Sequence, residues 1–187
     1  ATCLWNVWMW MHSEESNDQQ GIEMMHQVCT QDCQDMIMLL ARALLHKDLN
    51  SSRQFRALMR LTRVAYQLGI DDEWDYMRVT YARVCCVVNP EIGLEAPLNL
   101  PLGVELLQAE ARKSNGLAAS HLVYLYSGKH PVMEKDDEKH MLYMRRAAEL
   151  GNTKYADCLA HYYRDKDPWQ YRKWNRVGAS YGSFRGD

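Results

Sequence analysis

The chain has 187 residues, of which 47% are hydrophobic and 25% charged, with a formal net charge of −2. These values predict a soluble, well-ordered globular protein and exclude disordered and low-complexity classes. No apolar run approaches the roughly 20 residues that a membrane helix needs, and the slightly acidic composition argues against general nucleic-acid binding. The unusual counts are 6 Cys, 11 Met, 6 Trp and 11 Tyr beside only 2 Phe.

The N-terminus is rich in tryptophan. Trp5, Trp8 and Trp10 form an aromatic patch within residues 1–34, which are expected to be atypical N-terminal cap helices. The patch would cap the first helical layer; docking of a partner or a membrane surface is the alternative.

A histidine and two cysteines follow at steps of three and four. On a helix over 22–34, His26, Cys29 and Cys33 would share one face. A metal site would need a fourth ligand, for which His46 is a candidate, but the spacing matches no standard zinc motif. We therefore expect no metal, and we interpret the cysteines as buried thiols. The six cysteines permit disulfides without requiring them.

Residues 53–68 carry apolar side chains at helical spacing, which predicts a helix. Ser51 is expected to cap its start and Gly69 to end it. Its apolar face would consist of Phe55, Leu58, Met59, Thr62, Ala65 and Tyr66.

The opposite stripe of the same helix is basic. It contains Arg53, Arg56, Arg60 and Arg63. Because arginine forks bind carboxylates and phosphates, the stripe predicts a surface for an acidic group of a partner. A solvated helix face is the alternative.

Two further helices have clear end signals. Residues 137–150 begin with acidic and continue with basic side chains, and Gly151 is expected to end this helix. Asp167 is expected to cap a helix whose first residue is Pro168, with Gly182 closing it.

Several segments resemble one another. Residues 118–126 match 155–163 at a spacing of 37, 65–83 match 147–165 at 82, and 143–151 match 174–182 at 31. The spacings of 37 and 82 imply a unit of roughly 37–41 residues, a length typical of stacked helical repeats.

At these positions the chain resembles the Sel-one-like repeat (SLR) family, a relative of the tetratricopeptide repeat. The matching residues are Ala119, Leu122, Tyr126, Gly128, Asp136, Lys139, Ala147, Ala148 and Gly151. The match is good across 115–163 and partial across 35–82 and 164–182, whereas 85–101 departs from the pattern and contains three prolines.

The resemblance implies an all-α fold, an α/α superhelix (helical-repeat solenoid) of antiparallel helix pairs. We expect irregular repeats over 35–182, a tail at 183–187 and a single structural domain. In such a solenoid the first helix of each pair lines the concave face.

Aromatic residues supply the candidate binding surface. Tyr126 and Tyr163 occupy the repeated core position, so structure accounts for them. Other side chains on or beside first helices are predicted to contact a partner, because Tyr and Trp favour interfaces. They are Trp74, Tyr76, Tyr124, His161, Tyr162, Trp169 and Tyr171.

The predicted function is therefore that of a non-enzymatic adaptor or scaffold that binds a partner protein on its concave face. The alternative is an immunity protein that neutralises a secreted bacterial toxin by occlusion, and a third is an uncharacterised enzyme. No catalytic motif occurs, and we expect neither a cofactor nor nucleic acid as a ligand. The sequence starts at Ala1, so either the initiator Met or a longer leader has been removed; of the two compartments, the bacterial periplasm after leader removal is favoured over the cytoplasm. The oligomeric state stays open.

Overall fold

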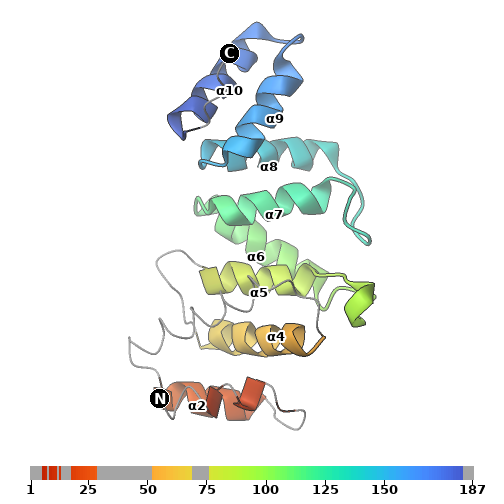
Figure 1. Cartoon of the computed structure of the whole chain (residues 1–187), viewed down its shortest axis with the longest axis vertical. Helices are drawn as coiled ribbons and strands as arrows, with labels where there is room; N and C mark the ends of the chain where they lie inside the picture. Colours follow the sequence, from red (N-terminus) through yellow and green to blue (C-terminus); the bar gives the residue numbers. More distant parts are fainter. Residues whose placement is uncertain are drawn as a thin grey trace. The chain divides into compact units, whose positions relative to one another are not determined.

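The computed structural model describes residues 6–7, 9–11, 13, 18–28, 52–68 and 76–182. The described part is all-helical, as predicted, apart from one isolated antiparallel bridge between Asn89 and Leu94 (Figure 1). The helices are α2 (Asp18–Val28), α4 (Ser52–Gln67), α5 (Tyr76–Cys86), the 3₁₀ helix η1 (Pro90–Ile92), α6 (Leu100–Arg112), α7 (Gly116–Tyr126), α8 (Asp137–Glu149), α9 (Thr153–Tyr163) and α10 (Pro168–Ser180). No helix in these ranges has the length and apolar character required to cross a bilayer.

The chain divides into two compact units, Ala1–Gly103 and Val104–Asp187, with the boundary inside α6. Each unit is described by itself. The helices expected over 53–68, over 137–150 and from Pro168 are confirmed as α4, α8 and α10. The helix expected over 22–34 overlaps α2, while 29–51, 69–75 and the tail 183–187 lie outside the described residues.

Helix α4 forms the centre of the first unit. The predicted apolar face is confirmed, since Phe55, Leu58 and Ala65 are each at most 1% exposed. A second set of α4 side chains is also fully buried: Ala57, Leu61 and Val64. The prediction of one apolar face was too narrow, because α4 packs against both α2 and α5 and must be apolar toward each.

The N-terminal tryptophans are partly placed. Trp10 is buried against α2, and a Cβ at Gly21 would lie only 2.1 Å from its ring, so this close approach requires glycine. Trp10 therefore belongs to the core, as the capping interpretation predicts, while Trp5 and Trp8 lie outside the described residues.

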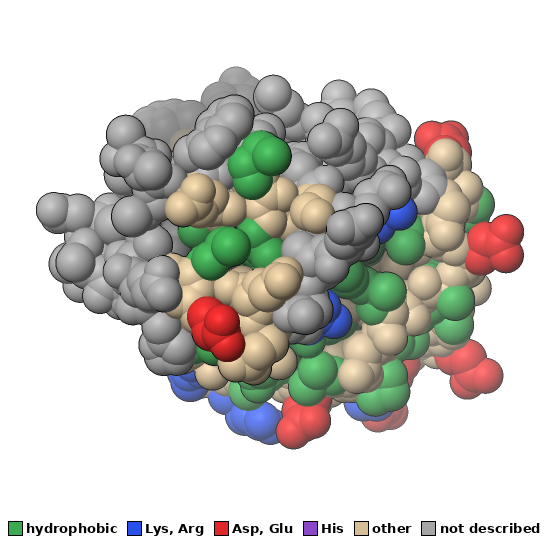
Figure 2. All heavy atoms as spheres, turned by 90° about the horizontal axis from the view of Figure 1, so that it is seen from below, with side chains coloured by type: hydrophobic (Ala, Val, Ile, Leu, Met, Phe, Trp, Pro, Cys, Tyr) green, Lys and Arg blue, Asp and Glu red, His purple; other side chains and the backbone are tan. Residues whose placement is uncertain are grey.

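The arginine stripe of α4 is partly used inside the first unit. The Arg60 guanidinium donates to the carbonyl oxygens of Trp10 (3.4 Å), Met11 (3.5 Å) and Ser13. Carbonyls at the end of a helix lack intrahelical partners, and a cation there is favourable. These hydrogen bonds of Arg60 connect residues 10–13 to α4. The face seen in Figure 2 shows basic and acidic side chains dispersed among hydrophobic and uncharged ones.

The similarity of residues 65–83 to residues 147–165 predicts the end of α4 correctly but not the end of α5. Helix α4 ends at Gln67, 82 positions before the end of α8 at Glu149, as the similarity predicts. Helix α5, however, continues to Cys86, beyond Tyr81, whereas α9 ends at Tyr163. The ring of Tyr81 stacks on Tyr66 of α4 at 5.0 Å, so in α5 this position is an internal packing site.

In the second unit the starts and ends of the helices recur at fixed spacings along the chain. Helices α8 and α9 begin and end 37 positions after α6 and α7, and α10 begins and ends 31 positions after α8. Figure 1 shows α7, α8, α9 and α10 following one another as neighbours. The spacings of 37 and 31 read from short segments thus apply to whole helices.

The turns between α6 and α7 and between α8 and α9 also correspond. Each contains one residue in the left-handed conformation, Ser114 (φ 78°) and Gly151 (φ 96°). In each, the next asparagine N–H donates back to the preceding helix: Asn115 to Glu110 (3.1 Å) and Asn152 to Ala147 (3.0 Å). The prediction that Gly151 ends its helix in this conformation is confirmed.

In both layers a tyrosine hydroxyl accepts a hydrogen bond from a side chain 18 positions earlier. Tyr126 is 4% exposed, stacks on Tyr143 at 5.7 Å, and accepts a hydrogen bond from Gln108 Nε2 at 3.0 Å. The same contact recurs 37 positions later, where Arg145 donates to the Tyr163 hydroxyl at 2.6 Å. These tyrosines are structural, as the sequence predicts.

Small side chains let the helices of the second unit approach closely. Its last hydrophobic cluster consists of Ala148, Ala156, Leu159, Ala160 and Trp174, all at most 3% exposed. This cluster packs α8, α9 and α10 together and uses only one side of α9, which leaves the other side available for a site.

Candidate functional site

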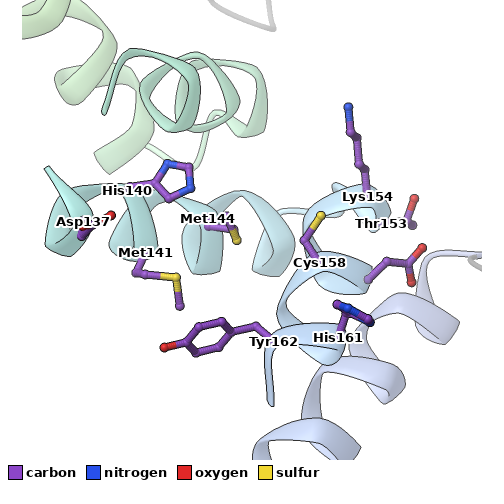
Figure 3. Close-up of a pocket in the computed structure, with 10 residues that line it drawn as sticks. Asp137, His140, Met141, Met144, Thr153, Lys154, Cys158, His161 and Tyr162 are labelled. Atoms are coloured by element: carbon purple, nitrogen blue, oxygen red, sulfur yellow. The ribbon is translucent and has the colours of Figure 1, made fainter. Parts of the chain in front are cut away.

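The second unit contains a hollow of about 1050 Å³ bordered by α8 and α9 (Figure 3). Helix α8 contributes Asp137, His140, Met141 and Met144, and α9 contributes Thr153, Lys154, Asp157, Cys158, His161 and Tyr162. We call it the α8–α9 groove. Its volume is at the upper end of the range for ligand sites, so it has room for several side chains of another molecule.

The helical repeat explains why α9 faces the groove. Ala156, Leu159 and Ala160 turn toward the core. Cys158 and His161, next to them in the sequence, must then point away from it. Both of these residues are exposed. The opposite side of α9 therefore carries thiol, imidazole and phenol groups.

A hydrogen bond orients the imidazole of His140. Its Nδ1 lies 2.9 Å from the carbonyl oxygen of Val123 in α7. A carbonyl oxygen only accepts hydrogen bonds, so Nδ1 carries the hydrogen, and this fixes the ring orientation. His140 thus lines the groove with a ring of fixed orientation.

The ring of Tyr162 is also held in place. It meets Tyr163 edge to face at 4.9 Å, and Lys166 Nζ lies 3.7 Å from the ring centroid. In Figure 3 this ring extends toward Met141. Tyr162 nevertheless remains 47% exposed, so nearly half of its surface is available to a second molecule.

Acidic and basic side chains both line the groove. Asp137 pairs with Lys135 at 2.8 Å, and Asp157 also interacts with a neighbour. Lys154 is exposed in the first turn of α9, a turn that contains no acidic residue. Asp157 follows Lys154 by three positions, so side chains of both charges line this end of the groove.

The cysteines fall into two environments. Cys158 is exposed in the groove, whereas Cys85 and Cys86 are buried in the first unit, and all three are free thiols. Burial, with a smaller contribution from the neighbouring Cys85, raises the pKa of the Cys86 thiol to about 12. Cys85 and Cys86 therefore remain neutral thiols near pH 7, and Cys158 is the accessible one among the three.

The predicted partner-binding residues occupy different places. His161 and Tyr162 lie together in the groove, whereas Tyr124 and Trp169 are exposed outside its lining, and Tyr171 packs against the core cluster. In the first unit, Arg56 is exposed, Arg60 binds backbone carbonyls, and Arg63 is partly buried. Trp74 lies outside the described residues, as do the side chains of Tyr76 and Arg53.

The structure does not test the His26 group, because Cys29, Cys33, His46 and the His26 side chain lie outside the described part. Within the part that is described, no three His, Cys, Asp or Glu side chains are grouped so that they could hold a metal ion.

The sequence interpretation missed the α8 side of the groove. Met141 and Met144 are three positions apart, so they were readable as one face of a helix, yet this spacing is equally typical of core residues. Lys154 and Cys158 were findable by placing them with His161 on the side of α9 opposite Leu159.

No family model, curated protein or solved structure matches this chain.

Proposed function

We propose that this protein is a helical-repeat protein of the Sel-one-like type that binds another protein through the α8–α9 groove. The main observation that supports the proposal is the presence of this groove. It is an open hollow on the side of α9 opposite the core, with a held but exposed tyrosine at one end.

The repeat architecture is supported by the second unit. Two consecutive helix pairs share their bounds, their left-handed turn and their tyrosine contact at a spacing of 37. A layer of this kind buries its apolar face only by stacking on its neighbours, which is the principle of a solenoid. In the Sel-one-like scheme the helix pairs are α7–α8 and α9–α10, so that α7 and α9 are first helices and the shared left-handed turn joins one pair to the next.

Protein binding is supported by the composition of the groove. Tyr162 offers a rigid ring with a polar tip, a type of side chain that often dominates interface energetics. Met141 and Met144 are flexible and apolar and can adapt to a partner's side chain. A site of this kind is suited to recognition and needs no chemical step.

The test is affinity capture with the full-length chain from a lysate of the native host, followed by titration calorimetry with each captured protein. The variant is Tyr162→Ala, and the matched control is Leu142→Ala, an exposed apolar residue of α8 that does not line the groove. We expect a partner whose affinity falls at least roughly tenfold with Tyr162→Ala and stays unchanged with Leu142→Ala.

Equal affinity of Tyr162→Ala for every captured protein would contradict the proposal. The identity of the partner separates the roles: inhibition of a toxin in proportion to the amount of complex would indicate immunity, and several unrelated partners would indicate a scaffold.

A further inference from the structure

The outward side of α10 combines an exposed tryptophan with two arginines. Trp169, Arg172 and Arg176 follow one another at steps of three and four, so they lie on one side of the helix. The buried positions of α10, Trp174 and Gly178, lie on the other side. Trp169 is 67% exposed, the largest fraction among the large hydrophobic side chains in the described part of the chain. We call Trp169, Arg172 and Arg176 the α10 face.

The positive charge of the α10 face is not balanced within its helix. Helix α10 contains three basic residues and no acidic one. Lys173 is engaged, since its Nζ lies 3.8 Å from a Glu149 carboxylate oxygen and 4.5 Å from the centre of the Trp174 ring. Arg172 and Arg176 are exposed, and neither guanidinium has an ion pair or hydrogen bond with another described residue. Two cations on this face are therefore available to a ligand.

The carboxylates that precede α10 do not supply the missing charge. Asp167 caps the helix by accepting hydrogen bonds from two of its amides, at 2.9 and 3.1 Å. Asp165 stands between Arg164 and Lys166 in the connection before the cap. From position 164 to position 182 the chain has five basic residues and two acidic ones, so this segment is basic in a chain whose net charge is −2.

The preceding layer shows how a helix covers the equivalent side. Helix α10 begins and ends 31 positions after α8, so Arg172 corresponds to Met141 and Arg176 to Arg145. Met141 packs against the core cluster, and Arg145 donates to the hydroxyl of Tyr163 in α9 at 2.6 Å. A helix that packed on α10 as α9 packs on α8 would bring an acceptor group to Arg176.

The side chains of the α10 face decide which kind of helix fits. Because an arginine takes the place of Met141, the occupant must be polar at this point. Guanidinium groups bind carboxylates through paired hydrogen bonds. Arg172 and Arg176 are about 6 Å apart along the axis, and two carboxylates four positions apart on a second helix have the same spacing. Trp169, one turn before Arg172, offers area to an apolar side chain.

Other negatively charged ligands fit the α10 face less well. Nucleic acids and anionic membranes bind to extended basic surfaces, whereas this face has two available arginines and the whole chain has a net charge of −2. The α10 face of a second copy would bring arginines against arginines. A short acidic segment of another protein needs only the local charge.

We propose that the α10 face binds an acidic helix of a partner protein, in which two carboxylates stand four positions apart beside an apolar residue. The carboxylates pair with Arg172 and Arg176, and the apolar side chain lies on Trp169. None of these three residues lines the α8–α9 groove, so the α10 face is a second interaction surface, beyond the one in the proposed function.

The experiment uses three fluorescein-labelled helical peptides and the full-length protein. In each peptide two positions four apart are both Glu, both Gln or both Lys, with a Leu three positions before and another three positions after the pair, so that either direction of binding is offered. These three residue types have similar helix propensities. We measure binding by fluorescence anisotropy at low and at physiological salt, and we expect the Glu peptide to bind at least roughly tenfold more tightly than the Gln peptide, by a margin that shrinks with salt.

Charge reversal gives the sharper comparison. The double variant Arg172→Glu, Arg176→Glu should reverse the preference, so that the Lys peptide binds more tightly than the Glu peptide. Trp169→Ala should weaken the Glu and Gln peptides by the same factor, because it removes apolar contact and no charge. The matched control is Lys129→Glu, at an exposed lysine outside α10, and it should leave all affinities unchanged. Circular dichroism confirms that each variant is folded.

Each remaining outcome contradicts the proposal. Equal binding of the Glu and Gln peptides, or binding of neither at low salt, overturns it. If the double variant instead abolishes binding to polyuridylate or to phosphatidylserine vesicles, or abolishes self-association in sedimentation, the face belongs to a polyanion or to a second copy. Tyr162→Ala should leave the peptide affinities unchanged while it weakens a partner bound in the α8–α9 groove, so this inference and the proposed function fail separately.

Discussion

The α6–α7 and α8–α9 layers have the same frame but present different surfaces. Some buried positions keep their character, with Leu122 and Leu159 both fully buried 37 positions apart, whereas the buried Leu125 corresponds to the exposed Tyr162. Their outward positions do not, since Leu117 and Tyr124 of α7 correspond to Lys154 and His161 of α9. Stacking constrains only the inward side of each layer, so the outward side is free to diverge and to specialise for binding.

The connections that follow these layers differ in length. Residues 127–136 join α7 to α8, and His130 of this connection is buried and meets the ring of Tyr124 at 6.0 Å. The connection from α9 to α10 covers only 164–167. The longer connection therefore covers part of α7 with its own side chains, whereas the outer side of α9 remains open as a groove.

The largest effects should come from the paired leucines. Leu122→Ala and Leu159→Ala each remove a fully buried side chain, so each should lower the free energy of unfolding by about 2–5 kcal/mol. Urea unfolding of the full-length chain, followed by circular dichroism, measures both. A large loss in one layer and none in the other would show that the two layers are not equivalent.

Substitutions at the two left-handed turns should change stability by different amounts. Gly151→Val places a β-branched residue at φ 96° with its Cβ 3.3 Å from the Tyr181 ring, so stability should fall by about 2 kcal/mol. Ser114→Gly removes the same conformational strain from the other layer but loses the hydrogen bond from Arg146 (3.0 Å).

We therefore expect Ser114→Gly to change stability by less than about 1 kcal/mol, and thermal unfolding of both variants gives the comparison. An unchanged melting curve for Gly151→Val would refute the role of this turn.

The smallest effects concern the two tyrosine contacts. Gln108→Ala should destabilise by about 1 kcal/mol, because the Tyr126 hydroxyl is largely shielded from water. Arg145→Ala should have a smaller effect, about 0.5 kcal/mol, since its contact with Tyr163 is exposed to solvent. Double-mutant cycles with Tyr126→Phe and Tyr163→Phe isolate each contact, and equal coupling energies would contradict this difference.

The helix ends were the most predictable part of the fold. Asp167 accepts from the amides of Trp169 and Gln170 as a cap should, and Gly182 adopts φ 89° after α10. Caps depend on residues within one turn, so the local sequence contains the information. The second buried side of α4 depends on α2 and α5, which the local pattern does not reveal.

The candidate site was half predictable for the same reason. His161 and Tyr162 stood out because the repeated tyrosine at Tyr163 fixes which side of α9 is structural. The contribution of Met141 depends on how α8 and α9 pack, and a methionine at helical spacing is equally typical of a core. Arg60 shows the opposite case, since a basic stripe that suggested a surface site contains a residue that binds backbone carbonyls.

The matching turns after α6 and α8 also have a consequence for deletions and duplications within the chain. A chain without residues 116–152 would join Asn115 directly to Thr153, which is the junction that α9 already follows after Asn152. Gln108 would then stand 18 positions before an equivalent tyrosine, Tyr163 taking the place of Tyr126. The 37-residue segment 116–152, which contains α7 and α8, can therefore be deleted or duplicated without requiring a new turn.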